Sequence, residues 1–319
     1  MSIIKGKKWL KPRVFEENPR TMTFKDIIYF SYKYYYSSPL VPENQEIEKH
    51  FSSRIDSKID EFQTLVTVSI GGDLMPYELI KPKNTQSLWD EVGPDFFASD
   101  IVFANLETPF VEAIPENFVP EVMLNNMLFN TDQNTFDVFN GNKKFKGFDI
   151  LSVANNHSID QGIDGLDETI NKLNSLGIKS IGGRIKKDDT GFEVVEVNGV
   201  KIAFLAYTYS LNQFTLDKDL QWKVNYLRLN TESVSIDEIA QDAIKCRQMG
   251  AELVVCSLHC GNAYQVYPSQ LTINLYQNIF SNCGVDVIAG GHPHNLQPWN
   301  SYTFKDPISG KAKSRFCNL

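Results

Sequence analysis

The stretch Val-Asp-Val-Ile-Ala-Gly-Gly-His-Pro-His, residues 285–294, decides the fold class of this chain. Its first five residues are mostly apolar and β-branched, which predicts a short buried strand. Two glycines follow the strand, and then His292-Pro293-His294. Because proline fixes the backbone between the two histidines, both rings are aimed from a stiff turn. The stretch therefore predicts an α/β protein with metal-binding side chains beyond a strand end.

Four other apolar runs of strand length end in the same way. Each stops at a residue that can bind a metal or accept a proton. The runs are 65–70 before Gly71-Gly72-Asp73, 101–104 before Asn105-Leu106-Glu107, 150–154 before Asn155-Asn156-His157, and 253–258 before His259. Ligands of α/β sheets bind outside the carboxyl ends of the strands. We therefore expect these polar side chains to converge on one shared cleft.

Helical patterns lie between the strands, at residues 166–176, 236–249 and 271–280. In the first of them, apolar residues at helical spacing fall on one face. Residues 194–197 and 201–206 flank Asn198-Gly199, which predicts a hairpin with a type I′ turn. The rhythm of strand, loop and helix predicts one α/β domain over residues 63–319.

Residues 1–62 differ in composition from the rest of the chain. Ile47, Phe51, Ile55 and Ile59 recur at helical spacing within this region. Such spacing is typical of an amphipathic helix. We interpret residues 1–62 as an N-terminal helical extension.

The composition excludes several classes of protein. A chain of 319 residues that is 42% hydrophobic can bury a large core. Its net charge of −8 disfavours nucleic-acid binding, because like charges repel. The five cysteines form no C-x-x-C pair, which is typical of reduced thiols in a cytoplasmic protein. We find no secretory signal and no apolar run of transmembrane length, so we expect a cytoplasmic protein.

Candidate metal ligands are concentrated at the strand ends. Four of the five histidines lie there, and His157 is one of them. The candidate ligands are the other three histidines with two carboxylates and one amide, namely His259, His292, His294, Asp73, Glu107 and Asn156. Imidazole is the commonest metal ligand, carboxylates can bridge two ions, and an amide offers a neutral oxygen. This mixed set of nitrogen and oxygen donors suits Mn, Fe or Zn.

Plainer interpretations exist for most of these residues. Asp73 after two glycines can cap a turn, and the Asn-Asn-His-Ser run can begin a helix. His259 can be a hydrogen-bonded core histidine. A thiolate site around it is disfavoured, because strand alternation turns His259 away from Cys256 and Cys260. The His292-Pro293-His294 turn is the hardest to explain without a metal.

Taken in order, the motifs resemble the CapA (poly-γ-glutamate capsule synthesis, PGA_cap) family. They are Gly-Gly-Asp73-Leu-Met, Ala-Asn105-Leu-Glu107-Thr-Pro, Ala-Asn-Asn156-His157-Ser-Ile-Asp160-Gln-Gly162, Ser-Leu-His259-Cys-Gly and Gly-Gly-His292-Pro-His294-Asn-Leu-Gln-Pro. The resemblance runs from about Val66 to the end and leaves residues 1–62 uncovered. Three departures stand out. Met75 stands where related enzymes have a histidine, Cys260 replaces an aromatic residue, and the sequence stops early, so we expect a domain truncated at its C-terminus.

The resemblance implies a fold and a set of residue roles. The family is similar to calcineurin-like metallophosphoesterases, which implies a two-sheet sandwich flanked by helices (αββα). By this resemblance two divalent metals bind, the first to Asp73 and His294, the second to Asn156, His259 and His292, with Glu107 as the bridge. His157 would be the general acid, oriented by Asp160.

The resemblance also implies two alternative functions. One is a metal-dependent hydrolase of a phosphoester or γ-glutamyl amide, acting on an anionic small molecule or polymer in poly-γ-glutamate or capsule biosynthesis. The other is a non-catalytic accessory or polymer-binding subunit of a capsule synthesis complex, which Met75 favours. We expect the inserts at residues 111–134 and 210–226 to line the substrate pocket, although they carry no motif that identifies the substrate.

Overall fold

The computed structural model describes residues 23–24, 27–28, 42, 45–52, 66–308 and 310–318. Most of the predicted N-terminal extension, including Ile55 and Ile59, lies outside these residues, and so does the predicted boundary near residue 62. Within the described residues, no helix is long and apolar enough to cross a membrane.

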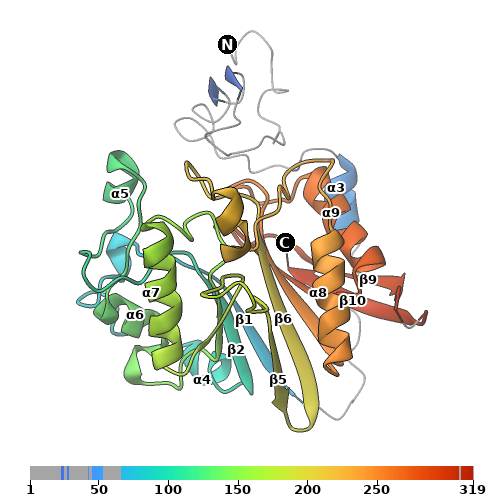
Figure 1. Cartoon of the computed structure of the whole chain (residues 1–319), viewed down its shortest axis with the longest axis horizontal. Helices are drawn as coiled ribbons and strands as arrows, with labels where there is room; N and C mark the ends of the chain where they lie inside the picture. The colour runs from blue at the N-terminus through green and yellow to red at the C-terminus, as the bar shows by residue number, and fades with distance from the viewer. Residues whose placement is uncertain are drawn as a thin grey trace.

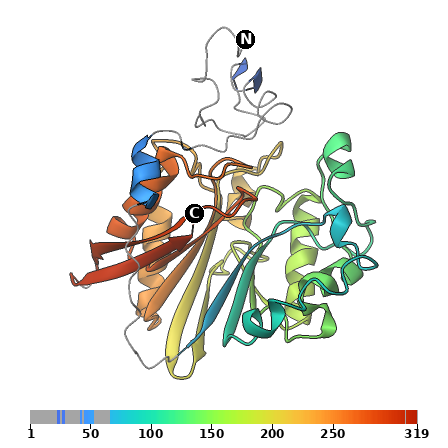
Figure 2. The same cartoon turned by 180° about the vertical axis from the view of Figure 1, so that it is seen from behind.

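Two β-sheets form the centre of the molecule (Figure 1). The first is parallel and consists of β1 (Val68–Leu74), β2 (Ile101–Leu106), β3 (Ile150–Ser152) and β4 (Lys179–Ile181), in that order. The second has the order β5-β6-β7-β8-β10-β9, with β5 (Glu193–Val197), β6 (Val200–Thr208), β7 (Leu253–His259), β8 (Val287–Gly291), β9 (Trp299–Lys305) and β10 (Ala312–Asn318). Figure 2 shows the β9–β10 hairpin at the outer edge of this sheet.

Helices cover the outer faces of the two sheets (Figure 1). On the side of the first sheet lie α4 (Gly93–Phe96), α5 (Glu121–Asn125), α6 (Gln133–Phe139) and α7 (Gly162–Ser175). On the side of the second lie α8 (Asp237–Gln248) and α9 (Gln270–Asn282). The predicted αββα sandwich is confirmed, as are the three predicted helices, whose ends differ by a few residues.

Strand β6 explains how the core is divided. Its residues 202–208 are all buried, because one face packs on the first sheet and the other on helices. Phe204 meets Phe103 of β2 at 5.6 Å between ring centroids, in the cluster between the sheets. Leu205 and Tyr207 belong to a second cluster that includes residues of α8 and α9. The two sheets therefore share one apolar layer that holds their strand ends together.

Local sequence signals set two turns that matter for the architecture. Asn198 and Gly199 have φ values of 52° and 79° and join β5 to β6, which confirms the type I′ hairpin. By contrast, the strand predicted to stop at Ile70 continues to Leu74, with an irregular register between Ile70 and Asp73. That end prediction was wrong because pairing with β2 resumes at Asp73 and Leu74, beyond the irregularity at the two glycines.

The described part of the N-terminal region packs on the second sheet. It forms α3 (Gln45–Ser52), whose Ile47 is buried and whose Phe51 joins the cluster around α9. His50 Nε2 lies 3.2 Å from the hydroxyl of Tyr302 in β9. This helix therefore covers the sheet near the β9–β10 hairpin.

Candidate metal centre

The carboxyl ends of strands from both sheets bring the predicted ligands together. Asp73 lies at the end of β1 and Glu107 directly after β2, while His259 ends β7. The His292-Pro293-His294 turn follows β8, and Asn156 follows β3. All six predicted ligands lie in one cluster, connected by the short distances given below.

Glu107 is the centre of this cluster. Its side chain is fully buried, and neither carboxylate oxygen has a hydrogen-bond partner within the described part of the chain. Oε1 lies 3.4 Å from Nε2 of His259 and 3.8 Å from Nε2 of His294. Burial raises the pKa of Glu107 to about 8, although His294 opposes this shift. A buried carboxylate without hydrogen bonds is costly unless a cation compensates its charge.

Glu107 belongs to two groups of potential ligands. In the first group, ligand atoms of Glu107, His259 and His292 all lie within 4.8 Å of one another. In the second, the same holds for Asp73, Glu107 and His294. Asn156 adds an oxygen to the first group, with Oδ1 at 2.8 Å from His259 Nε2. Two adjacent groups that share one carboxylate fit two cations with a common ligand.

Asp73 is held by neutral donors and faces two histidines. Its Oδ1 accepts a hydrogen bond from Asn105 Nδ2 at 2.8 Å, and its Oδ2 accepts one from the backbone N–H of His292 at 2.7 Å. Oδ2 also lies 3.5 Å from His294 Nδ1. Burial alone would raise the pKa of Asp73, but His259, His294 and the Asn105 amide hold it well below its ordinary range. The Asp73 side chain is therefore ionised and could bind a cation.

The histidine turn has an unusual backbone. His292 and His294 have φ values of 91° and 51°, a region that residues other than glycine rarely adopt. The hydrogen bond from the His292 N–H to Asp73 helps to hold this conformation. The hydroxyl of Tyr209 lies 3.1 Å from His292 Nε2. With Nε2 facing the tyrosine, Nδ1 is the atom that His292 can offer to a metal.

His157 and Asp160 form a pair beside the cluster. Nδ1 of His157 lies 2.6 Å from Oδ2 of Asp160, which also accepts the backbone N–H of Phe129 at 2.7 Å. The Phe129 ring meets the imidazole edge-on at 4.2 Å. Burial raises the pKa of Asp160, while His157 opposes the shift. The ring is thus held on two sides, by Asp160 and by Phe129.

Three further polar residues contact the cluster, and none of them was predicted as part of it. Asn105 donates to Asp73 and lies 3.2 Å from His259 Nδ1, and its place at a strand end was a usable signal. Tyr209 contacts His292. Asn212 accepts a hydrogen bond from Asn156 Nδ2 at 3.1 Å. Tyr209 and Asn212 lie in or beside a loop without a motif, so no local pattern identifies them.

The cysteines are poor candidates for metal ligands. All five are buried and free. Cys256 and Cys260 belong to the core cluster around α8 and α9, and Cys260 Sγ lies 4.0 Å from the hydroxyl of Tyr276. Burial raises the pKa of Cys260 to about 12. A protonated thiol in an apolar core is a poor metal ligand.

Two solved structures with a similar fold illustrate the likeness. One is the calcineurin-like phosphoesterase YfkN from Bacillus subtilis, with 17% identity, a TM-score of 0.39 and coverage of 73% of each chain. Another is a putative 5'-nucleotidase from Staphylococcus aureus, with 12% identity, a TM-score of 0.45, and coverage of 79% of this chain and 54% of that one.

Sequence comparison gives a more specific result. The chain is 28% identical over 249 residues to the PGA biosynthesis protein CapA of Bacillus subtilis (strain 168), covering 75% of this chain and 60% of that protein. It is 28% identical over 242 residues to the capsule biosynthesis protein CapA of Bacillus anthracis, covering 74% of this chain and 56% of that protein. The chain thus spans less than two thirds of these relatives. Residues 67–312 match the model of the bacterial capsule synthesis protein PGA_cap, and the chain therefore belongs to the PGA_cap family.

Proposed function

We propose that this chain is a metal-dependent hydrolase with a dinuclear centre, which cleaves a phosphoester or a γ-glutamyl amide in poly-γ-glutamate or capsule biosynthesis. The observation that carries the proposal is the buried carboxylate of Glu107, whose oxygens accept no hydrogen bond among the described residues. It lies between two groups of histidine and carboxylate ligands. A protein keeps such a group where a cation or a reaction uses it.

The donor set fits two divalent cations. Asp73 and His294 would hold the first ion, and Glu107 would bridge to the second. The remaining ligands of the second ion would be Asn156, His259 and His292. Nitrogen and oxygen donors without a thiolate favour Mn, Fe or Zn. Two buried carboxylates also need a compensating positive charge, which the ions would provide.

The residues beside the ligands have roles of their own. When bound, divalent ions supply Lewis-acid stabilisation of negative charge on a phosphoryl or acyl oxygen. Asp160 holds Nδ1 of His157, so Nε2 is the ring nitrogen that would donate a proton to the leaving group. Tyr209 and Asn212 keep His292 and Asn156 turned toward the centre. The protein thus orients both the ligands and the acid.

The proposed substrate is an anion. The chain carries a net charge of −8, so an anionic substrate needs a local positive field, and bound cations would supply it. The names of the two curated relatives refer to biosynthesis of PGA and of the capsule. A capsule polymer, or a small precursor of it, is therefore the substrate class that we propose.

A second candidate is an accessory subunit that binds the polymer without cleaving it. Met75 favours this role, because it stands where related enzymes have a histidine ligand. The first ion would then have only Asp73, Glu107 and His294 as protein ligands. Fewer ligands weaken metal binding and reduce the catalytic contribution of that ion.

The two candidates are separated by metal content and by turnover. Elemental analysis of the purified chain should give about two metal ions per chain for the dinuclear hydrolase. Hydrolysis should be measured with p-nitrophenyl phosphate, bis-p-nitrophenyl phosphate and poly-γ-glutamate, each with added Mn²⁺. Cleavage of one of them, lost in His292→Ala, supports the hydrolase. Binding of poly-γ-glutamate without cleavage of any substrate would instead support the accessory role.

A further inference from the structure

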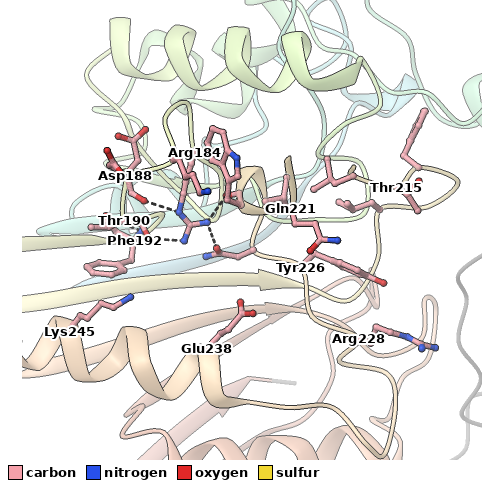
Figure 3. Close-up of a pocket in the computed structure, with 18 residues that line it drawn as sticks. Arg184, Asp188, Thr190, Phe192, Thr215, Gln221, Tyr226, Arg228, Glu238 and Lys245 are labelled. Carbon is pink, nitrogen blue, oxygen red and sulfur yellow. Dashed lines mark hydrogen bonds between the residues drawn. The ribbon is translucent and has the colours of Figure 1, made fainter. Parts of the chain in front are cut away.

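A second concave site lies beside helix α8. It is a cavity of about 940 Å³ between the loop after β4, the segment 211–228 and helix α8 (Figure 3). None of the six candidate metal ligands lines it. Cavities of roughly 300–1,000 Å³ are the usual size of small-molecule sites. Part of the insert predicted to line a pocket, residues 210–226, forms one wall.

One wall carries a fixed positive charge. Arg184 donates hydrogen bonds to the backbone oxygens of Asp189 (2.9 Å), Thr190 (2.8 Å) and Trp222 (2.9 Å), and to the side-chain oxygen of Asn225 (2.6 Å). All four acceptors are neutral. No carboxylate of the described residues forms an ion pair with Arg184. The guanidinium is therefore held rigidly while its charge stays uncompensated.

Contacts of Lys223 hold the segment that carries Arg184 in place. The ammonium of Lys223 is buried and lies 2.6 and 2.7 Å from the two carboxylate oxygens of Asp167 in α7. It also donates to the backbone oxygen of Ile185 at 3.1 Å. The backbone N–H of Arg184 donates to the Lys223 carbonyl at 2.9 Å. These contacts tie the loop to the helix, so the wall is preformed, which lowers the cost of binding a ligand.

The opposite wall carries a negative charge. Glu238 and Lys245 project from α8 into the cavity (Figure 3). Lys245 pairs with Asp242 at 2.8 Å, so its charge is compensated. Glu238 forms no ion pair in the described part of the chain. Arg184 and Glu238 thus face each other across the cavity without meeting, and each has an unmatched charge.

The lining as a whole indicates the kind of ligand. Four basic side chains stand against three acidic ones; they are Arg184, Lys187, Arg228 and Lys245 against Asp188, Asp189 and Glu238. This mixture of signs favours neither a polyanion nor a polycation. Four aromatic side chains also line the cavity, namely Phe192, Phe214, Trp222 and Tyr226. Aromatic side chains provide contact area for an apolar group.

We propose that this cavity binds a small zwitterion, an amino acid or short peptide with an apolar side chain. The carboxylate lies against Arg184, the ammonium group lies against Glu238, and the apolar side chain packs on the aromatic lining. Such a ligand satisfies both unmatched charges at once. The site does not depend on the metal centre.

The test uses the full chain and three matched probes. Isothermal titration calorimetry compares L-alanyl-L-phenylalanine, its N-acetyl derivative and its C-terminal amide. We expect the zwitterion to bind about tenfold or more tightly than either derivative, because each derivative lacks one charge-assisted hydrogen bond. Equal binding of all three probes, or binding of none, overturns the proposal.

Two further comparisons locate the site. In Glu238→Gln, the affinity for the dipeptide should fall to the affinity that the unchanged chain has for the N-acetyl derivative. The control is Glu232→Gln, which makes the same change at an exposed position outside the cavity and should leave the affinity for the dipeptide unchanged. Binding should also persist in the presence of EDTA. Loss of binding in EDTA would show that the dipeptide binds to a metal instead. Equal affinities of the two variants for the dipeptide would show that Glu238 does not contact it. Either result overturns the proposal.

Discussion

Oε1 of Glu107 lies 3.4 Å from Nε2 of His259, although the two residues are far apart in the sequence and lie at the ends of strands from different sheets. The approach depends on the packing of the first sheet against the second. A fully buried carboxyl group that accepts no hydrogen bond among the described residues opposes folding, since its charge is desolvated. The two sheets therefore hold this group where a cation would stabilise it, which makes Glu107 the most informative residue to change.

Glu107→Gln should abolish metal binding while preserving the shape of the side chain. Removing a residue that only orients a metal ligand lowers the metal affinity by up to about 100-fold. Because Glu107 would itself be a ligand, we expect the affinity for Mn²⁺ to fall by more than this. The Mn²⁺-dependent rise in melting temperature should disappear with it, because a ligand stabilises only the state that binds it. Calorimetry and thermal unfolding check this, with exposed Glu112→Gln as the control. Retained affinity in Glu107→Gln would contradict the bridging role.

Tyr209→Phe should weaken metal binding without unfolding the chain. The change removes the hydroxyl that lies 3.1 Å from His292 Nε2 and keeps the buried ring. Loss of such an orienting contact costs about 10- to 100-fold in metal affinity. Tyr207→Phe is the matched control, because its hydroxyl instead donates to Asp242 at 2.8 Å. If both variants bind Mn²⁺ like the unchanged chain, Tyr209 does not orient His292.

His157→Gln should separate chemistry from metal binding. In the proposed hydrolase His157 donates a proton, and a general acid contributes about 10²- to 10⁴-fold to the rate. We expect kcat to fall within that range while metal content per chain stays unchanged. His50→Gln, which changes the one histidine outside the centre, should alter neither quantity. A variant at position 157 that loses its metal would show that this histidine is a ligand.

How much of this centre can be predicted from the sequence depends on the kind of contact. Asp73, Glu107, His259 and the histidine turn all follow apolar runs, and the ends of parallel strands meet by geometry. Asn212 could not be predicted in this way. It reaches Asn156 from a loop of the other sheet, 56 residues away, and its position depends on how the sheets pack.

The end of β1 shows the same limit for the fold. Two glycines predict that the strand stops at Ile70, yet it continues through Asp73 to Leu74. Local preference was overridden by pairing with β2, where Asp73 lies beside Asn105. The β9–β10 hairpin was not predicted, although its strands alternate polar and apolar residues, a pattern typical of a half-buried strand.

The five cysteines should be unreactive in the folded chain. Burial raises the pKa of Cys246, Cys260, Cys283 and Cys317 to about 12, and raises that of Cys256 as well. Because only the thiolate reacts, labelling by DTNB at pH 8 should be negligible until the chain unfolds. In denaturant all five thiols should react. Rapid labelling of a thiol in the folded chain would contradict the burial of that cysteine.

Asp306→Asn should destabilise the fold through a buried ion pair at the β9–β10 hairpin. Arg315 of β10 is fully buried, and its Nη2 lies 2.6 Å from Oδ2 of Asp306, while its Nη1 donates to the backbone oxygen of Val285 just before β8. The pair therefore joins the hairpin to the strand that leads to His292. Removing Asp306 leaves the buried charge of Arg315 only partly compensated, which costs about 3 kcal/mol.

Urea unfolding of the metal-free chain measures this cost directly, without a contribution from metal binding. The control is Glu78→Gln, which removes an exposed pair with Lys81 and should change the free energy of unfolding by less than about 0.5 kcal/mol. Asp286 lies 3.5 Å from Arg315 Nη1 and retains part of the compensation in the variant. The double variant Asp306→Asn with Asp286→Asn should therefore lose more than Asp306→Asn alone. If neither variant is less stable than Glu78→Gln, the hairpin is held by its apolar contacts and its ladder of hydrogen bonds, and the ion pair contributes nothing measurable.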